Sequence, residues 1–521
     1  MLQEVIVNVR KGEKLSDVLK RRGYDEIPAN CIINKMLPGL GITHCELVSE
    51  RDSIIVEPNV PVIKKKMERY KRAFGMYEGI SSQDVANYLL SQSIPFKKIL
   101  ITPDSFFKIK EIMEELYINM YESFFLLLDE CERHFPLDVM RQDFFRFRNR
   151  SFVASSPVIS SDPLMRENGF YTLTIKPDYE YRQSISLIAT NNVAETLLAN
   201  ISGIEGPVCI FCHSLDTVNS LLSDIPLLRK EGRVFEGEKP LSHPCGEDFQ
   251  PHRSYVNRLG NYNLFTSHYF LAVDIEFPVR ANVILISDLF SANPSFIDPA
   301  TDAMQIAGRL RGGIKSMTHI SNIDPELSFY TPKQARTWLK NAGKIYMGWV
   351  RKMESVQHEG ARAILREAVR QSTYSRFVDK AGNINPLSIT KFIDSETVKG
   401  LYTNVKLLQE AYSATKHFDV TLLREVHIFS DKDRLLLNHK LTQEGRNRLL
   451  LTRFEQLEVL RKARSSKAQM RYRHLIDRLL VNPSDNFLYQ CFMEYGSNFI
   501  RNAGYKEVVM RKEINKLLTI S

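Results

Sequence analysis

Residues 31–47 read CIINKMLPGLGITHCEL. This pattern predicts a buried strand, a glycine loop and the start of a helix. Such a loop points backbone N–H groups at a phosphate, and the N-terminus of the following helix adds a partial positive charge. Gly39 and Gly41 would let the backbone approach the phosphate, and the Thr43 hydroxyl would ligate magnesium. The segment therefore predicts a phosphate-binding loop.

One position of this loop departs from the usual pattern. The residue before the threonine is normally a lysine that reaches the β- and γ-phosphates, and here it is Ile42. Losing a charge-assisted phosphate contact is expected to cost several kcal/mol of nucleotide or transition-state binding. Lys35 is a nearby replacement, although the end of a strand is a poor position for it.

An acidic pair follows a second apolar segment. Residues 124–132 read FFLLLDECE, which predicts a buried strand ending in Asp129 and Glu130. At such a place the Asp can hold magnesium and the Glu can polarise an attacking water. Residues 152–157 then read FVASSP, where Ser155 and Ser156 can bond to the acidic pair and couple chemistry to domain movement.

Residues 301–313 read TDAMQIAGRLRGG. Gly308 would let the backbone come close to a phosphate. The guanidiniums of Arg309 and Arg311, preceded by Gln305, can neutralise the charge that develops on a transferred phosphoryl group. This segment predicts that a second lobe contributes to the same nucleotide site.

Polar residues end two other predicted strands, on the edge of a parallel sheet where ligands bind. Thr102 and Ser105 follow one strand, and Thr266 and Ser267 follow another. We expect these four hydroxyls to contact the phosphates of a nucleic-acid strand. For the first pair, capping of the following helix is the alternative, and both roles are compatible.

Short apolar runs alternate with amphipathic stretches from about residue 29 to 335. Several runs are continuously apolar, as in parallel strands buried on both faces, so we predict an α/β fold with two doubly wound lobes. The predicted strands are Cys31–Asn34, Ser53–Glu57, Lys98–Thr102, Phe124–Leu128, Phe152–Ala154, Tyr171–Ile175, Val208–Phe211, Tyr262–Thr266 and Asn282–Ser287. We expect the first lobe at residues 1–178 and the second at 179–333.

Long helical patterns dominate after about Thr331, so residues 334–521 are expected to form a basic, all-helical C-terminal domain. The predicted helices are Gln334–Val356, Glu359–Gln371, Thr397–Ala411 and Leu441–Leu480. Between Arg446 and Arg478 the chain carries ten Lys or Arg residues against three acids. We expect Arg461, Lys462 and Arg464 to contact nucleic acid, with a solvated surface as the alternative.

The composition bounds the class of protein. A chain of 521 residues is too long for one core, so two to four domains are expected. The net charge of +9 favours a polyanionic partner, and no apolar run reaches the roughly 20 residues needed to span a bilayer. Seven scattered cysteines argue against a disulfide framework. We therefore expect a soluble cytoplasmic protein that binds nucleic acid and no membrane.

In this order, the motifs resemble those of superfamily-two helicases over roughly residues 30 to 315. The Gly-Arg-x-Arg form is most similar to the herpesvirus-type origin-binding helicases and related phage or bacterial proteins. The resemblance implies two RecA-like lobes with ATP and Mg²⁺ between them and single-stranded nucleic acid across their top. By position, Gly39, Gly41 and Thr43 correspond to the phosphate loop, and Asp129 and Glu130 to the metal-binding and water-activating acids.

The same resemblance assigns the remaining motifs. Ser155 and Ser156 correspond to the coupling motif, and Gln305, Arg309 and Arg311 to the closing motif. Ala154-Ser155-Ser156 replaces the more usual Ser-Ala-Thr, and the second arginine is one step closer than in the commonest spacing.

Three functions are compatible with these patterns. The first is an ATP-dependent DNA helicase or translocase, acting in replication or in mobile-element or phage DNA metabolism, with replication proteins as possible partners. The alternative is a helicase-like DNA-binding scaffold or origin-binding protein that has lost hydrolysis, which Ile42 favours. A non-hydrolysing nucleotide sensor is the third possibility, supported only by the weakened loop.

Overall fold

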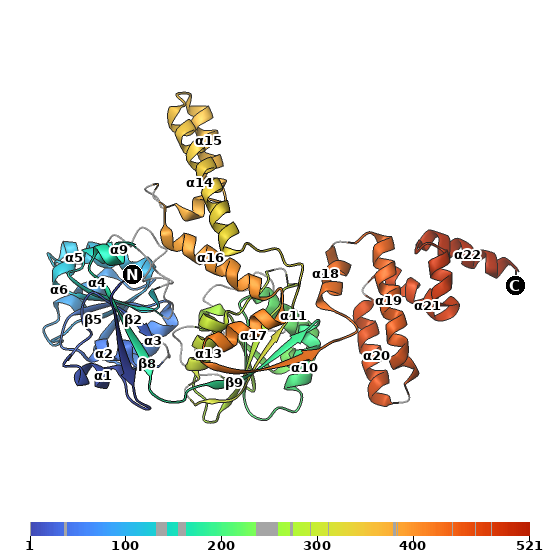
Figure 1. Ribbon diagram of the computed structural model, residues 1–521, viewed down its shortest axis with the longest axis horizontal. Coiled ribbons are helices and arrows are strands. Elements are labelled where there is room, and N and C mark those ends of the chain that lie inside the picture. Colours follow the sequence, from blue (N-terminus) through green and yellow to red (C-terminus); the bar gives the residue numbers. More distant parts are fainter. Residues whose placement is uncertain are drawn as a thin grey trace.

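The computed structural model describes residues 2–35, 39–131, 143–154, 163–235, 259–270, 275–291, 293–310, 312–378, 382, 384–439, 441–463, 465–480 and 482–520. Figure 1 shows two lobes that each contain a sheet, a pair of helices that projects away from them, and further helices at the C-terminal end.

The first lobe contains an eight-stranded sheet within the described residues. All its neighbouring strands pair in parallel. In spatial order they are β1 (Glu4–Val9), β8 (Tyr171–Pro177), β2 (Cys31–Lys35), β7 (Asn149–Ala154), β6 (Phe125–Leu128), β3 (Ser53–Val56), β5 (Lys98–Ile101) and β4 (Ala73–Met76). The carboxyl ends of β2, β6 and β3 therefore lie along one edge of this sheet.

The second lobe contains a seven-stranded sheet within the described residues, again with parallel pairing throughout. In spatial order its strands are β11 (Gly232–Phe235), β12 (Tyr262–Phe265), β10 (Val208–Phe211), β13 (Ala281–Ser287), β14 (Ile314–Ser321), β9 (Gln183–Thr190) and β15 (Phe418–Glu425). Its edge strand β15 comes from far along the chain, after the projecting helices.

Both sheets are covered on both faces. Successive residues of one strand enter different cores: Ile54 packs into one hydrophobic cluster and Ile55 into another. In the second sheet Leu187 and Ile188 are divided in the same way. This two-sided burial explains why the strands read as continuous apolar runs, and it confirms the prediction of two doubly wound α/β lobes.

Short helices cover the sheets. Those of the first lobe are α1 (Leu15–Arg21), α2 (Ile42–Val48), α3 (Val60–Arg69), α4 (Ser82–Leu90), α5 (Phe106–Glu115), α6 (Met120–Ser123) and α9 (Pro163–Glu167). Those of the second are α10 (Val193–Ile201), α11 (Leu215–Asp224), α12 (Pro226–Glu231), α13 (Met304–Arg309) and α17 (Val405–Ala414). In α13, the helix of the Gln305 motif, Arg309 is the last residue.

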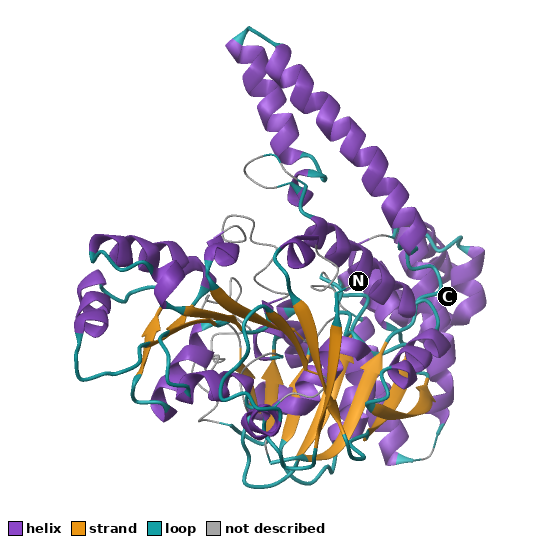
Figure 2. Ribbon diagram, turned by 60° about the vertical axis from the view of Figure 1, so that its left-hand side comes forward, coloured by secondary structure: helices purple, strands orange, loops and turns teal. Residues whose placement is uncertain are grey.

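The chain between β14 and β15 forms the projecting part. We call α14 (Pro332–Ser355) and α15 (Glu359–Gln371) the arm, and α16 (Pro386–Leu401) lies at its base. Leu339, Tyr346, Tyr374 and Phe377 form the small core that roots the arm. Figure 2 shows the two arm helices running side by side, away from the sheets.

The last helices form what we call the tail. They are α18 (Asp431–His439), α19 (Gln443–Lys462), α20 (Ser466–Leu479), α21 (Pro483–Asn502) and α22 (Glu507–Ile520). A hydrophobic cluster that includes Leu450, Phe454, Leu475 and Leu488 holds them together. The tail thus has a core of its own, separate from those of the two lobes.

All nine predicted strands are present, with ends shifted by a few residues. The helical C-terminal region is also present, with β15 as an exception that the sequence pattern did not predict. The predicted helix Thr397–Ala411 is divided between α16 and α17, and Leu441–Leu480 between α19 and α20. Strands β1, β4, β9, β11 and β14 were not predicted either.

A search of the described helices finds none that is both long and apolar enough to cross a lipid bilayer.

The tail depends on one buried ion pair. Arg446 donates two hydrogen bonds to Asp485, from Nε to Oδ1 at 2.7 Å and from Nη2 to Oδ2 at 2.6 Å. Asp485 is fully buried. We predict that Arg446→Ala lowers the free energy of unfolding of the tail by about 3–5 kcal/mol, because it leaves a buried carboxylate without its cation.

Urea denaturation followed by circular dichroism would measure this loss. Arg461→Ala is the control: Arg461 is more exposed and pairs with Glu458, so its removal should change stability by less than about 1 kcal/mol. Equal effects of the two substitutions would contradict the prediction.

Candidate functional site

A cavity of about 690 Å³ lies between the two lobes. The first lobe contributes residues of the glycine loop, of α2 and α3, and the acidic pair, whereas the second lobe contributes Glu276 and Arg309. Its lining includes Lys14, Lys35, Gly39, Gly41, Thr43, Lys65, Lys66, Glu68, Arg69, Asp129 and Glu130. The predicted phosphate loop, acidic pair and first arginine of the closing motif therefore meet in one cavity.

The glycine loop uses glycine where the backbone requires it. Gly39 has φ +84° and Gly41 has φ +77°, in the left-handed region that favours residues without a Cβ. Gly41 directly precedes α2. Glu130 also lies in this region, with φ +50°, which costs energy for a residue with a side chain. That backbone conformation follows the end of β6 and brings Glu130 into the cavity lining.

Glu130 contacts side chains of both lobes. Its Oε1 accepts a hydrogen bond from Lys35 Nζ at 2.5 Å and another from Arg309 Nη2 at 3.1 Å. All three side chains are buried. Lys35 belongs to the strand β2 of the same lobe, whereas Arg309 ends α13 of the other lobe. One carboxylate therefore binds a cation from each lobe.

Arg309 is held in place by its own lobe. Its Nη2 also lies 3.0 Å from Gln305 Oε1, and its Nε donates to the carbonyl of Phe270 at 3.5 Å. Gln305 of the predicted closing motif therefore positions the arginine that reaches across. A weaker contact between Lys65 and Glu276, at 3.7 Å, also joins the lobes.

Asp129 lies beside the threonine of the loop. Thr43 Oγ1 donates to Asp129 Oδ2 at 2.7 Å. A hydroxyl and a carboxylate at this spacing fit Mg²⁺, which uses one or two protein oxygens and keeps several waters. Among the described residues, no group of three or more His, Cys, Asp or Glu could hold a metal ion. Thr43 and Asp129 are the oxygen donors that a magnesium ion bound here would use.

Sequence reasoning missed two charged residues next to this pair. Lys66 Nζ lies 2.6 Å from Glu57 Oε1 and 3.6 Å from Asp129 Oδ2. Glu57 follows β3 and is fully buried, and its Oε2 has no hydrogen-bond partner among the described residues. The only sequence signal was that Glu57 is the last residue of a predicted strand; nothing indicated that Lys66, nine residues later, faces the same edge.

The cations shift the acidity of the carboxyl groups. Burial by itself raises the pKa of Asp129, but Lys35 and Lys66 outweigh burial and hold that pKa well below its usual range. Burial likewise raises the pKa of Glu130, but Lys35 and Arg309 bring it below the ordinary value. Glu57 differs, because burial dominates and raises its pKa to about 7 despite Lys66.

Ile42 stands where a phosphate loop has its lysine, and its side chain is buried with Leu40 and Cys45 in the core of the first lobe. Lys35 instead extends from the end of β2 to the acidic pair, with its Nζ 3.8 Å from Asp129 Oδ1 as well as in contact with Glu130. Lys35, for which the end of a strand was expected to be a poor position, therefore lies in the cavity beside the acidic pair.

The predicted nucleic-acid contacts are distributed over both lobes. Thr102, which follows β5, is buried, and its hydroxyl lies 3.1 Å from that of Ser105. Thr266, which follows β12, is also buried and donates to the carbonyl of Phe235 at 3.3 Å. Ser267 is half-buried. All four residues follow the carboxyl ends of strands, as expected, while their binding of nucleic acid stays a prediction.

The basic residues predicted in the tail have internal partners. Arg461 and Lys462 both pair with Glu458, at 2.5 and 3.2 Å. Arg453 pairs with Asp433 at 2.8 Å. These ion pairs neutralise part of the positive charge that was expected to bind nucleic acid. The coupling residues Ser155 and Ser156, together with Arg311 and Arg464, lie outside the described residues.

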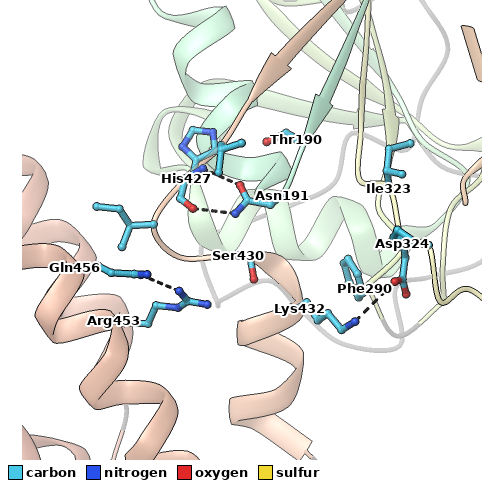
Figure 3. Close-up of a pocket in the computed structure, with 13 residues that line it drawn as sticks. Thr190, Asn191, Phe290, Ile323, Asp324, His427, Ser430, Lys432, Arg453 and Gln456 are labelled. Carbon is cyan, nitrogen blue, oxygen red and sulfur yellow. Dashed lines mark hydrogen bonds and ion pairs between the residues drawn. The ribbon is translucent and has the colours of Figure 1, made fainter. Parts of the chain in front are cut away.

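A second cavity, of about 600 Å³, lies where the tail meets the second lobe (Figure 3). Asn191 and His427 exchange hydrogen bonds at its edge, and Lys432 lies 3.7 Å from Asp324. Beside it Arg434 joins α18 to Asp224 of α11 at 2.8 Å. Polar contacts of this kind fasten the tail to the carboxyl edge of the second sheet.

No family model matches the sequence, and no curated protein matches it. Among solved structures, the chain is similar to a variant of Dbp5 from S. cerevisiae bound to a Gle1 variant and IP6, with 16% identity and a TM-score of 0.37, covering 57% of this chain and 78% of that one. It is also similar to a DEAD box protein from the hyperthermophile Methanococcus jannaschii, with 15% identity and a TM-score of 0.33, covering 59% and 84%. The description of the fold rests on the two parallel sheets themselves.

Glu57 provides a pH test of the site. Its pKa is about 7 in the folded protein against 4.5 ordinarily, so the folded state holds the proton more tightly than the unfolded chain. Its contribution to stability is therefore fully present below about pH 4.5 and is lost as the pH rises through about 7. We predict that Glu57→Gln removes this loss.

The melting temperatures of the wild type and of Glu57→Gln, measured between pH 5 and pH 8, would show this loss of stability. Relative to the wild type, Glu57→Gln should gain stability as the pH rises, whereas Glu68→Gln, at an exposed carboxylate of the same cavity, should follow the wild type. A difference in melting temperature between wild type and Glu57→Gln that does not change with pH would contradict the prediction.

Proposed function

We propose that the chain is an ATP-dependent helicase or translocase of the superfamily-two type that acts on DNA. The observation that carries this proposal is the double contact of Glu130 with Lys35 and Arg309, inside a cavity lined by the glycine loop. This double contact supports a site that is assembled from both lobes, in which a bound nucleotide can change the contact between the lobes. Net positive charge supports a polyanionic substrate.

Lys35 takes the role of the missing loop lysine in this proposal. Burial lowers the pKa of Lys35, but Glu130 and Asp129 outweigh it and raise the pKa above its ordinary value, so the side chain stays cationic. A buried ammonium beside Gly39 and Gly41 is suited to bind the terminal phosphates of a nucleotide. The charge lost at Ile42 is thus supplied from the preceding strand.

Nucleotide binding would exchange ion pairs within the cavity. Phosphate oxygens would draw Lys35 and Arg309 away from Glu130, which would free its carboxylate to polarise the attacking water. Mg²⁺ held at Thr43 and Asp129 would neutralise charge on the phosphates. Since Arg309 belongs to the second lobe, this exchange would couple the state of the nucleotide to the position of the lobes.

The nucleic acid would lie across the carboxyl edges of the two sheets. Thr102 and Ser105 on one lobe and Thr266 and Ser267 on the other would bind its phosphates, so that lobe movement would shift one set of contacts relative to the other. Arg311, Ser155 and Ser156 would complete the site as the resemblance implies. We propose a role in replication or in mobile-element or phage DNA metabolism.

A scaffold without hydrolysis is the second candidate. Ile42 supports it, because the loop lacks the lysine that makes a charge-assisted contact with phosphate. In that case the chain would bind DNA, at an origin or within a replication complex, and would not turn over ATP.

Hydrolysis of ATP by the purified protein, with and without single-stranded DNA, separates the two candidates. We predict DNA-stimulated hydrolysis that falls by at least about 100-fold in Glu130→Gln, which removes the water-polarising carboxylate, while DNA binding is retained. Glu276→Gln is the control, because Glu276 lies in the same cavity but is largely exposed. Absence of hydrolysis with DNA binding intact would favour the scaffold, and stronger stimulation by RNA than by DNA would contradict the choice of DNA.

The role of Lys35 has its own test. We predict that Lys35→Ala lowers kcat/KM for ATP by at least about 100-fold, whereas Ile42→Lys raises it less than about tenfold, because the charge is already supplied. Binding of a fluorescent ATP analogue would show whether Lys35→Ala acts on nucleotide affinity, and circular dichroism would show that it folds. A large gain of activity in Ile42→Lys would mean that the site lacks its cation and that Lys35 does not replace it.

A further inference from the structure

The arm carries a row of positive charge along one side. Six Lys or Arg residues occur on α14 against a single acid, Glu354. Five of the six are spaced by three, four, four and seven residues, which places them on one face of a helix. The sixth, Lys352, directly follows the last of these five. The five are Lys333, Arg336, Lys340, Lys344 and Arg351. We call these five residues the basic row.

The basic row faces solvent. All five side chains are exposed, whereas the buried residues of α14 are Ala335, Leu339 and Tyr346 on the opposite face. Within the described residues, no carboxylate lies in ion-pair distance of any member of the row. The arginines of α15 contrast with this, since Arg366 pairs with Glu359 at 3.4 Å and Arg370 with Glu367 at 2.7 Å.

The arm is held only at its base. Between Tyr346 and Tyr374 no residue of the chain is buried, and all of this segment is described. Half-way along its length, α14 packs closely on the aromatic core: a Cβ added at Gly343 would lie 2.8 Å from the hydroxyl of Tyr374. Figures 1 and 2 show the arm extending beyond both lobes. Its basic row is therefore presented away from the interlobe cavity.

We propose that the arm binds the sugar–phosphate backbone of duplex nucleic acid adjoining the strand held by the lobes. From Lys333 to Arg351 the helix rises about 27 Å, and a duplex carries about one phosphate charge per 1.7 Å of its axis. A straight row of unpaired cations on a rigid helix matches the rigid backbone of a duplex better than a flexible single strand. The inference rests on the proposed function for the presence of nucleic acid, and it assigns the duplex to a surface outside the motor lobes.

The test uses the whole 521-residue chain without nucleotide. Fluorescence anisotropy would measure binding to a labelled DNA duplex of about 30 base pairs and to a single strand of about 10 nucleotides, over a range of KCl concentrations. The variant Lys340→Ala/Lys344→Ala removes two charges of the basic row. Its matched control, Arg366→Ala/Arg370→Ala, removes two exposed charges of α15 that already have carboxylate partners.

We expect the basic-row variant to bind the duplex about tenfold more weakly, with a slope of log affinity against log salt that is smaller by about 2. The control and the charge-retaining variant Lys340→Arg/Lys344→Arg should bind as the wild type does, and the single strand should be bound equally by all. Circular dichroism would verify that the variants keep their helix content.

The inference would be overturned if the α15 control weakened duplex binding as much as the basic-row variant does. It would also be overturned if the basic-row variant bound the duplex as the wild type does, and an acidic protein would then be the better partner for the row. The outcome is independent of ATP turnover, because no nucleotide is present. If the chain hydrolyses ATP but the basic row does not affect duplex binding, only the role of the arm is disproved. If the basic row does affect duplex binding but the chain does not hydrolyse ATP, only the proposed ATP-driven function is disproved.

Discussion

Within the described residues, the shared carboxylate of Glu130 is the buried ion-paired group that joins the two lobes. It is buried, its backbone has a positive φ, and it accepts hydrogen bonds from Lys35 of its own lobe and Arg309 of the other. A buried carboxylate is stable only while cations surround it, so whatever changes its partners also changes how the lobes are joined. The parallel strand order supplies this geometry, because β2 and β6 end at the same edge.

The strands that the sequence pattern predicted are those buried on both faces, where continuous apolar runs are unavoidable. The strands it missed include both edges of each sheet: β1 and β4 in the first, β11 and β15 in the second. Edge strands are short or face solvent, so they lack that signal. β15 alternates buried or half-buried with exposed residues, and β14 contains several polar residues, which hid both from a search for apolar runs.

Within the site, the residues that were predictable are those fixed by short motifs: Gly39, Gly41, Thr43, the acidic pair and Arg309. The contacts of Lys35 and Lys66 with the acids were not, because a contact such as Lys35 with Glu130 joins positions 95 apart in sequence. The charge of the tail is a different case, because its contact with nucleic acid stays a prediction. Counting basic residues there predicted a nucleic-acid surface, but Arg446 and Arg453 are used in internal ion pairs. Composition cannot distinguish a cation with a partner from one without.

The place of the arm in the second sheet has a mechanical consequence. The chain leaves that sheet after β14, forms the arm, and returns to it through α16 and α17 as β15, so both ends of the arm lead back to the same sheet. The arm must therefore turn with the second lobe, as a lever whose fulcrum is the contact between the lobes. A helix of 24 residues is about 36 Å long, so a rotation of about 10° at its base sweeps its tip through about 6 Å. Small movements at the shared carboxylate thus become large displacements at the far end of α14.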